Sequence, residues 1–356
     1  MRVLFVVSSN KYTGAAAAAE HYCRALQAVG VRTRFLFVGG NNLQARLNGF
    51  DWAIPTLRKE RGVTDLKANV ATIRKHASGS DLTVCHLPHD HSLCHLSSVW
   101  KLTPLIRNFR NAKHVGRGPL QARLNRRLSG ALFANTAMEH QFNRLRHETL
   151  PTAALPVPLE ERFRPGRDAH HWRQELSIPG AAPVLGMIGK VAVGRGFDTL
   201  LQTAARLPHD LHILIVGHGE ARPQLEALAA SLGLGQRVHW TGYRGRELPE
   251  LYAAMDVTLF PAAGSDHGHR AISEAQGCAR PVVAAALPGV EDLIEDGVTG
   301  RIVPAEPESF AAAVAAILDD PALARRLGDA AARAVEPRRF QAAGHRLASH
   351  LERILR

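Results

Sequence analysis

The chain has 356 residues, of which 46% are hydrophobic and 21% are charged. This composition is typical of a folded protein with a large core, and the length favours two domains, which excludes a single small module and a disordered chain. No window approaches the ~20 apolar residues that a membrane-spanning helix needs, and the apolar start Val3–Val7 leads into Ser8-Ser9-Asn10 rather than a signal-peptide cleavage site. We therefore expect a cytoplasmic protein.

Positive charge is concentrated in the first half of the chain. Residues 1–160 contain 22 Lys and Arg against 9 Asp and Glu, whereas residues 161–356 contain 22 against 23. The stretch Arg107–Arg127 has seven cations, no acid and interleaved apolar residues, which is typical of a solvated face, of a site for an anionic substrate or of an anionic membrane surface. Nucleic acid is not expected as a partner, because no binding motif or row of aromatic residues accompanies the charge.

Short apolar runs alternate with helical patterns in the first half, as they do in parallel α/β units. The predicted elements are a strand at Val3–Val7, a loop at Ser8–Gly14, an Ala-rich helix that ends near Gly30, and strands at Thr33–Val38, Leu82–Cys85, Leu105–Ile106 and Leu132–Ala134. These elements predict a Rossmann-like domain at residues 1–160. The proline-rich stretch Leu150–Gly180 is typical of a linker.

The same alternation continues after the linker. The predicted strands are Val184–Ile188, Leu211–Val216, Val238–Thr241, Val257–Phe260, Pro281–Ala284 and Gly300–Val303, and the predicted terminal helices are Ala311–Leu318, Ala322–Ala334 and Phe340–Leu355. We expect a second Rossmann-like domain at 161–335 and a C-terminal helix at 336–356 that crosses back to the first domain. In such sheets, ligands bind beyond the carboxyl ends of the strands.

Two glycine-containing loops follow predicted strands and precede helices. Gly14 lies where the first helix begins, and a helix amino terminus favours anions, although a glycine there can also serve the turn alone. In the second loop, Lys190 and Arg195 are five residues apart between glycines and can converge on one diphosphate; the alternative is two surface cations on a turn. The segment does not match the P-loop pattern GxxxxGK[ST].

A third loop and helix, Pro261–Ala275, place Asp266 in the loop and Glu274 in the helix. Ionised carboxylates accept hydrogen bonds from the paired hydroxyls of a sugar or ribose, and the backbone N–H groups of His267–Arg270 would face a phosphate or a sugar. The spacing of Asp266, His267 and His269 fits no standard zinc signature. The four cysteines form no CxxC pair, so we expect reduced thiols and neither a zinc site nor a disulfide framework.

From Val184 to Val303 the chain resembles the donor-binding domain of glycosyltransferase family 4. The resemblance is carried by Gly189-Lys190, Arg195-Gly196, the pair Asp266 and Glu274, and the downstream segments Ile215–Gly219, Pro281–Ala284, Pro288–Val290 and Glu295–Gly300. Relative to the family pattern, the two cation types are exchanged and the first glutamate is shortened to Asp266. The resemblance implies an α/β GT-B fold, with two Rossmann-like domains facing across a cleft. It also implies retaining sugar transfer from a nucleotide-sugar co-substrate, with neither a metal nor another cofactor.

The resemblance also implies roles for individual residues. Lys190 and Arg195 would stabilise the charge that develops on the leaving diphosphate, and Asp266 would hold sugar hydroxyls, so these three are the predicted catalytic residues. The predicted donor-binding residues are Gly14, Gly189, Gly217, His267, Gly268, His269, Arg270 and Glu274. The predicted acceptor-binding residues are His86, His89, Asp90, Arg107 and Arg110. Arg110 stands where many relatives carry a histidine, which leaves His86, His89 and Asp90 as candidates to orient the acceptor hydroxyl.

We therefore expect a hexosyltransferase that uses a nucleotide-diphosphate sugar and a glycan or glycolipid acceptor in the biosynthesis of lipopolysaccharide or another cell-surface glycan. The basic half is expected to bring it to the inner face of the cell membrane as a peripheral protein. Two alternatives are a nucleotide-sugar epimerase or hydrolase of the same fold, and a non-catalytic polyanion-binding protein on a degenerate transferase fold. A dehydrogenase is not indicated, because neither half has the dinucleotide fingerprint.

Overall fold

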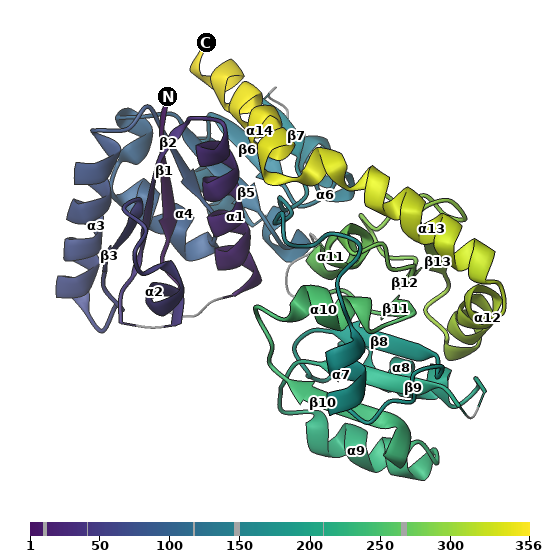
Figure 1. Cartoon of the computed structure of the whole chain (residues 1–356). Coiled ribbons are helices and arrows are strands. Elements are labelled where there is room, and N and C mark those ends of the chain that lie inside the picture. Colours follow the sequence, from purple (N-terminus) through teal and green to yellow (C-terminus); the bar gives the residue numbers. More distant parts are fainter. Residues whose placement is uncertain (10–12, 41, 117, 146–149, 209, 265–268) are drawn as a thin grey trace. The chain divides into compact units, whose positions relative to one another are not determined.

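The computed structural model describes the chain except residues 10–12, 41, 117, 146–149, 209 and 265–268. Two parallel sheets each form the centre of a compact unit (Figure 1). Unit 1 contains Met1–Glu160 and Arg338–Arg356, and unit 2 contains Glu161–Gly264 and His269–Pro337. The sequence predicts domain boundaries after residues 160 and 335; in the structure the chain passes between the units after Glu160 and after Pro337.

The sheet of unit 1 has seven strands in the order β3-β2-β1-β4-β5-β6-β7. Their bounds are β1 (Arg2–Val7), β2 (Arg32–Val38), β3 (Ala53–Leu57), β4 (Leu82–Cys85), β5 (Leu105–Phe109), β6 (Gly130–Phe133) and β7 (Thr152–Ala154). The central strands are buried on both faces, which explains their continuous apolar runs. The strand order reverses between β1 and β4, and the carboxyl ends of such a pair are the usual ligand-binding position of an open α/β sheet.

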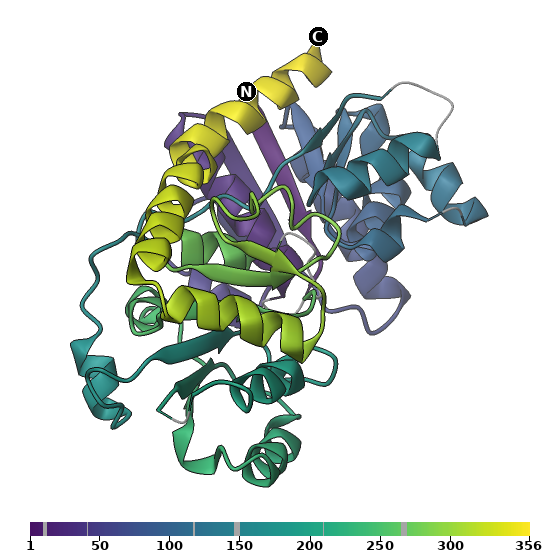
Figure 2. The ribbon, with the colours of Figure 1, turned by 90° about the vertical axis from the view of Figure 1, so that its right-hand side faces the viewer.

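Helices cover both faces of this sheet. They are α1 (Gly14–Ala28), α2 (Asn42–Leu47), α3 (Val63–Ala77), α4 (Pro88–Leu96), α5 (Pro119–Asn125), α6 (Thr136–Arg144) and α14 (Phe340–Leu355), with a short 3₁₀ segment η1 at Val99–Lys101 and another, η2, at Ala112–Val115. The last helix, α14, lies along α1 (Figure 2). Its Gly344 is so close to α1 that an added Cβ would lie 2.1 Å from the carbonyl oxygen of Ala25.

The sheet of unit 2 has six strands in the order β10-β9-β8-β11-β12-β13. They are β8 (Val184–Ile188), β9 (His212–Val216), β10 (Val238–Gly242), β11 (Val257–Phe260), β12 (Val282–Ala285) and β13 (Arg301–Val303). The helices are α7 (His170–Glu175), α8 (Phe197–Ala204), α9 (Arg222–Ser231), α10 (Leu248–Ala253), α11 (Arg270–Gly277), α12 (Pro307–Leu318) and α13 (Pro321–Ala334), and a 3₁₀ segment, η3, lies at Gly235–Arg237. Here the strand order reverses between β8 and β11.

The predicted α/β class with two Rossmann-like sheets is confirmed, and two edge strands are additions to it. The sequence does not predict β3, whose Pro55 weakens the strand pattern and is tolerated because the strand lies at an edge. The interpretation of residues 150–180 as a linker is wrong for Thr152–Ala154, which pairs with β6, and for α7. A three-residue edge strand between prolines gives too short a pattern to recognise.

The four cysteines are buried thiols outside any disulfide, as predicted.

Candidate functional site

In unit 2, the chain after β8 and the chain after β9 lie backbone against backbone. The N–H of Gly189 donates to the carbonyl of Val216 (3.0 Å), and the N–H of Val191 donates to the carbonyl of His218 (3.1 Å). An added Cβ on Gly217 would lie 1.8 Å from the carbonyl oxygen of Gly189, and one on Gly219 would lie 2.0 Å from that of Val191. Both glycines are therefore required by this close approach, which fixes the position of Lys190.

Lys190 forms an ion pair with an exposed carboxylate, and Arg195 acts on the same carboxylate through its charge alone. The Nζ of Lys190 lies 3.1 Å from Glu220, and Nη1 of Arg195 donates to the carbonyl of Ala263 (3.3 Å). The pKa of the exposed Glu220 carboxyl is lowered by its own backbone N–H, by the hydrogen bond and charge of Lys190 and by the charge of Arg195. The two predicted cations thus share an anionic neighbour, with which a diphosphate would compete. Glu220 was not predicted, because its proximity to Lys190 comes from the pairing of β8 with β9.

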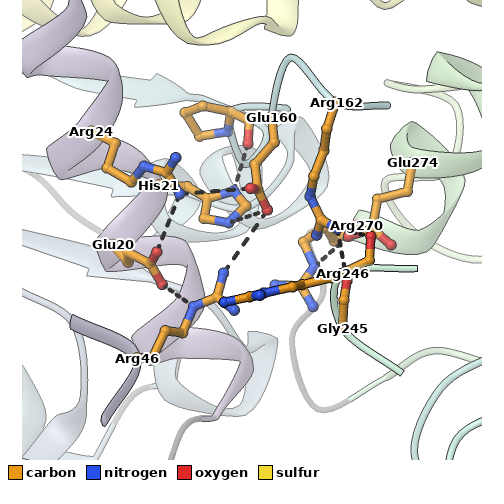
Figure 3. A network of polar contacts seen from close by, with 11 residues as sticks. Glu20, His21, Arg24, Arg46, Glu160, Arg162, Gly245, Arg246, Arg270 and Glu274 are labelled. Carbon is orange, nitrogen blue, oxygen red and sulfur yellow. Dashed lines mark hydrogen bonds and ion pairs between the residues drawn. The ribbon is translucent and has the colours of Figure 1, made fainter. Parts of the chain in front are cut away.

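The helix α11 and its N-cap residue carry three of the predicted donor-binding residues. His269 is buried, and its backbone adopts the left-handed conformation (φ 46°). Its Nε2 lies 3.1 Å from the carbonyl oxygen of Pro288. Arg270 pairs with Glu274, the Nε to Oε1 distance being 3.0 Å (Figure 3). The hydroxyl of Tyr252 donates to Oε2 of Glu274 (3.0 Å), and burial together with this carboxylate raises the pKa of Tyr252 well above its usual value.

This arrangement holds the Glu274 carboxylate in a fixed position through Arg270 and Tyr252. Tyr252 was not predicted, since nothing in its local sequence distinguishes it from a core tyrosine. Asp266, His267 and Gly268 lie outside the described residues, so their predicted roles stay predictions. Gly14 is the first residue of α1, after the N-cap Thr13.

In unit 1, Asp90 connects the chain after β1 to the start of α4. One of its carboxylate oxygens, Oδ1, accepts hydrogen bonds from the N–H (2.7 Å) and the hydroxyl of Ser8. The other, Oδ2, accepts from the N–H of Leu87 (2.7 Å) and of His86 (3.2 Å). Burial raises the pKa of Asp90, and these hydrogen bonds oppose the rise. With four donors on its two oxygens, Asp90 positions the switch-point loops; acceptor binding by this residue stays a prediction.

His86, Arg110 and Tyr22 form a buried cluster beside Asp90. The His86 ring stacks on Phe5, with ring centroids 5.7 Å apart, and Nη1 of Arg110 donates to the hydroxyl of Tyr22 (3.2 Å). Burial and the charge of Arg110 lower the pKa of His86 to about 3, so the imidazole is neutral at physiological pH. The two ring nitrogens of His86 are buried and have no partner in the described part of the chain. A neutral imidazole donates a hydrogen bond through one ring nitrogen and accepts one through the other.

Two further predicted acceptor residues lie apart from this cluster. His89 is exposed, and its Nε2 lies 3.1 Å from Glu60. Arg107 is fully buried: its guanidinium lies 4.3 Å from the centroid of the Phe109 ring, and Nη1 is 3.2 Å from Nδ1 of His91. Burial lowers the pKa of Arg107. Of the predicted acceptor set, the structure therefore brings together His86, Asp90 and Arg110.

A network of ion pairs holds Glu160, the residue after which the chain first leaves unit 1 (Figure 3). The buried carboxylate of Glu20 accepts from Nε of Arg46 (2.9 Å) and from Nη1 of Arg24 (3.4 Å). Glu160 lies 3.6 Å from Nη1 of Arg24 and 3.6 Å from Nε2 of His21, whose Nδ1 lies 2.8 Å from the carbonyl oxygen of Pro158. The network joins α1, α2 and the last residues before unit 2.

In the described part of the chain, no three His, Cys, Asp or Glu side chains are grouped closely enough to hold a metal ion. Asp266 and His267 are not covered by this finding, so the expected independence of metal stays a prediction. The described helices include none with the length and apolar character that crossing a bilayer requires.

Comparison with known proteins decides the family. Residues 182–320 match the family model for glycosyl transferases of group 1. Unit 2 is a group 1 glycosyltransferase domain. The predicted family resemblance is thereby confirmed, over the same part of the chain that carried the sequence motifs.

Relatives of this group 1 domain match over part of their length. Over 198 residues the chain is 35% identical to the D-inositol 3-phosphate glycosyltransferase of Xylanimonas cellulosilytica, covering 54% of this chain and 45% of that protein. Over 158 residues it is 34% identical to the lipopolysaccharide core biosynthesis glycosyltransferase LpsE of Rhizobium meliloti, covering 44% of this chain and 46% of that protein. The matches span less than half the length of these relatives.

The fold likeness extends beyond the group 1 domain to the whole chain. The crystal structure of Anabaena Alr3699/HepE in complex with UDP-glucose superposes with a TM-score of 0.86 at 20% identity, covering 99% of this chain and 100% of that one. The predicted GT-B fold is therefore confirmed.

Proposed function

We propose that the protein is a retaining, metal-independent hexosyltransferase that moves a sugar from a nucleotide-diphosphate donor to an acceptor hydroxyl. The observation that carries the proposal is the ion pair of Lys190 with the exposed Glu220 carboxylate (3.1 Å) in the loop after β8 of a group 1 domain, together with the charge of Arg195 that acts on the same carboxylate. Both cations lie in the loop that follows the carboxyl end of β8, which is the usual ligand-binding position of an open α/β sheet.

The chemistry requires charge stabilisation on the leaving group. As the bond between sugar and diphosphate breaks, the diphosphate gains negative charge and the sugar becomes oxocarbenium-like. Cations held in place beforehand lower this barrier without the cost of reorganising solvent. Lys190 and Arg195 take this role, Asp266 holds sugar hydroxyls, and the Glu274 carboxylate, fixed by Arg270 and Tyr252, accepts from the ribose hydroxyls.

The acceptor is proposed to be a glycan or glycolipid of a cell-surface pathway, which includes lipopolysaccharide. The support comes from the relative that acts in lipopolysaccharide core biosynthesis and from the basic first half of the chain. On the acceptor side we assign His86, Asp90 and Arg110, which lie together at the switch point of the unit 1 sheet. The same basic half supports peripheral association with the inner face of the cell membrane.

Removal of either cation tests the assignment. The best-binding nucleotide sugar is first found by thermal shift, and release of nucleoside diphosphate from it is then measured with a glycolipid extract as the acceptor source. Lys190→Ala and Arg195→Ala should each lower kcat by roughly 10²–10³-fold, as loss of one preorganised donor does. Arg206→Ala is the matched control, because Arg206 is an exposed cation paired with Glu308 before β9, at the amino-terminal edge of the sheet.

Wild-type turnover by Lys190→Ala and Arg195→Ala would overturn the assignment. Consumption of the donor that is unaffected by any acceptor would instead identify an epimerase or hydrolase. Nucleotide-sugar binding without turnover would identify a non-catalytic protein.

Metal independence is tested by chelation. Because Lys190 and Arg195 supply the positive charge at the diphosphate, we expect the same turnover in EDTA as in buffer with manganese. Activity that EDTA abolishes and manganese restores would contradict this mechanism.

A further inference from the structure

Unit 1 has a cationic pocket to which the proposed sugar transfer assigns no role, although its arginines belong to the basic half that supports the proposed membrane association. A cavity of about 480 Å³ is lined by His95, Trp100, Arg123, Arg126 and Arg127. The chain contains no Asp or Glu between Asp90 and Glu139, and among the described residues no carboxylate lies within ion-pair distance of the three lining arginines. The positive charge of the pocket is therefore not neutralised by the described part of the protein.

Trp100 contacts one of the lining arginines, Arg127, and the neighbouring Lys101. The Arg127 guanidinium lies 4.1 Å from its ring centroid, and the ammonium of Lys101 lies 5.2 Å from it. The His95 ring stacks on the same indole, with ring centroids 6.3 Å apart. Burial and the charges of Arg127 and Arg123 lower the pKa of His95, which is an independent sign of positive potential in the cavity.

The pocket lies where the parallel strands of the sheet begin, whereas the proposed acceptor site lies where they end. His95 and Trp100 precede β5, and Arg126 and Arg127 precede β6, so these residues are at the amino-terminal edge. Ser8, His86 and Arg110 follow the carboxyl ends of β1, β4 and β5. Because the strands are parallel, the pocket residues and the proposed acceptor residues are separated by the length of the strands.

We propose that this pocket binds a phosphate group through Arg123, Arg126 and Arg127. A guanidinium presents paired N–H donors that match two phosphate oxygens, and its contact with an aromatic face keeps the group oriented. The phosphate belongs either to a lipid headgroup or to a soluble phosphorylated compound. Leu96 and Leu102, the exposed apolar neighbours of His95 and Lys101 in the sequence, are 59% and 40% exposed, which suits the lipid source.

The experiment uses the full chain with Lys190→Ala, so that phosphate binding at the proposed donor site is weakened in every sample. The test variant adds Arg126→Gln and Arg127→Gln. The matched control adds Arg325→Gln and Arg326→Gln, since these are also adjacent exposed arginines, on α13 of unit 2. Arg123→Gln serves as a second test variant, and thermal melting verifies that each protein is folded.

Two probes distinguish the sources. Inorganic phosphate is titrated by calorimetry, and vesicles of phosphatidylcholine alone or with phosphatidylglycerol are used in co-sedimentation. Whichever of the two probes the control variant binds, the test variant should bind it at least about tenfold more weakly. One charge-assisted hydrogen bond contributes about this factor to the affinity. Arg123→Gln should weaken binding in the same direction.

If the protein binds phosphate but sediments equally with both kinds of vesicle, the proposal is supported and the ligand is a soluble phosphorylated compound. If it sediments more with the vesicles that contain phosphatidylglycerol, the proposal is supported and the ligand is a lipid headgroup. Equal binding by the test and control variants overturns the proposal, as does binding of neither probe. Sugar transfer is not measured, so failure here is distinguishable from failure of the proposed activity.

Discussion

A single buried carboxylate organises the switch point of unit 1. Asp90 accepts hydrogen bonds from Ser8, His86 and Leu87, and thereby joins the chain after β1 to the chain after β4. The sequence marks Asp90 as a candidate because it lies among histidines after a strand. Its partner Ser8 is 82 residues away, and only the pairing of β1 with β4 brings the two together.

Loss of this carboxylate should destabilise unit 1. Asp90→Ala leaves four backbone and hydroxyl donors without their acceptor in a buried position, and we expect it to lower the free energy of unfolding by about 3 kcal/mol. The measurement is urea denaturation, with hydrogen exchange to show that unit 1 is affected. Asp81→Ala is the control: Asp81 also accepts from a backbone N–H and a side chain, both of Arg2, but it is partly exposed, so its loss should cost ~1 kcal/mol or less. Equal costs would contradict the role of Asp90.

Site residues that lie close together in one segment of the chain could be predicted, whereas contacts between distant segments could not. Lys190 and Arg195 are recognisable because they lie in the glycine-containing loop after β8, and Glu274 because its spacing from Asp266 resembles the family pattern. Glu220 and Tyr252 gain their roles from chain pairing and helix packing, which no local pattern encodes.

Among the elements, buried strands were predicted well and edge strands poorly. β4, β8 and β11 have the predicted bounds because both faces are buried and the apolar run begins and ends with the strand. β3 and β7 lie at the two edges of their sheet, where fewer apolar residues are needed and proline is tolerated.

The helix pair α1 and α14 depends on one glycine. Alanine at position 344 would favour a helix by ~1 kcal/mol, but its Cβ would lie 2.1 Å from a backbone oxygen of α1, which no rotamer change relieves. We therefore expect Gly344→Ala to lower the free energy of unfolding by about 2 kcal/mol, measured by urea denaturation. Gln341→Ala, at an exposed position of α14, is the control and should be nearly neutral. A stabilised Gly344→Ala protein would show that the two helices separate at no cost.

At the scale of the whole molecule, the two units differ in what their sequences reveal. Unit 2 carries the family motifs and the family match, whereas unit 1 is covered only by the fold likeness of the whole chain to solved structures at low identity. Unit 1 is also the strongly basic half. The sequence therefore assigns a separate role to each candidate residue of unit 2, while in unit 1 it gives only a group of candidates.

The two units should also differ in their response to acid. Burial lowers the pKa of His86 and of His91 to about 3 and that of His350 to about 4, and all three belong to unit 1. A histidine with a lowered pKa in the folded state contributes stability that is fully present above its unfolded pKa near 6.5 and is lost as the pH falls toward the folded value. With three such groups, the free energy of unfolding falls by up to about 4 kcal/mol for each pH unit below pH 6.5. Asp90, whose pKa is raised, acts in the opposite direction and reduces this slope only at the acid end.

We therefore expect unit 1 to unfold before unit 2 as the pH is lowered from 7 to 4. In unit 2, burial also lowers the pKa of His212 and His239, but these side chains are half-buried and their contribution is smaller. Hydrogen exchange followed by mass spectrometry at several pH values resolves the two units, and His350→Gln should reduce the slope for unit 1 by the share of one proton. Loss of protection in unit 2 first, or a stability that does not change between pH 7 and 5, would show that the buried histidines do not govern acid unfolding.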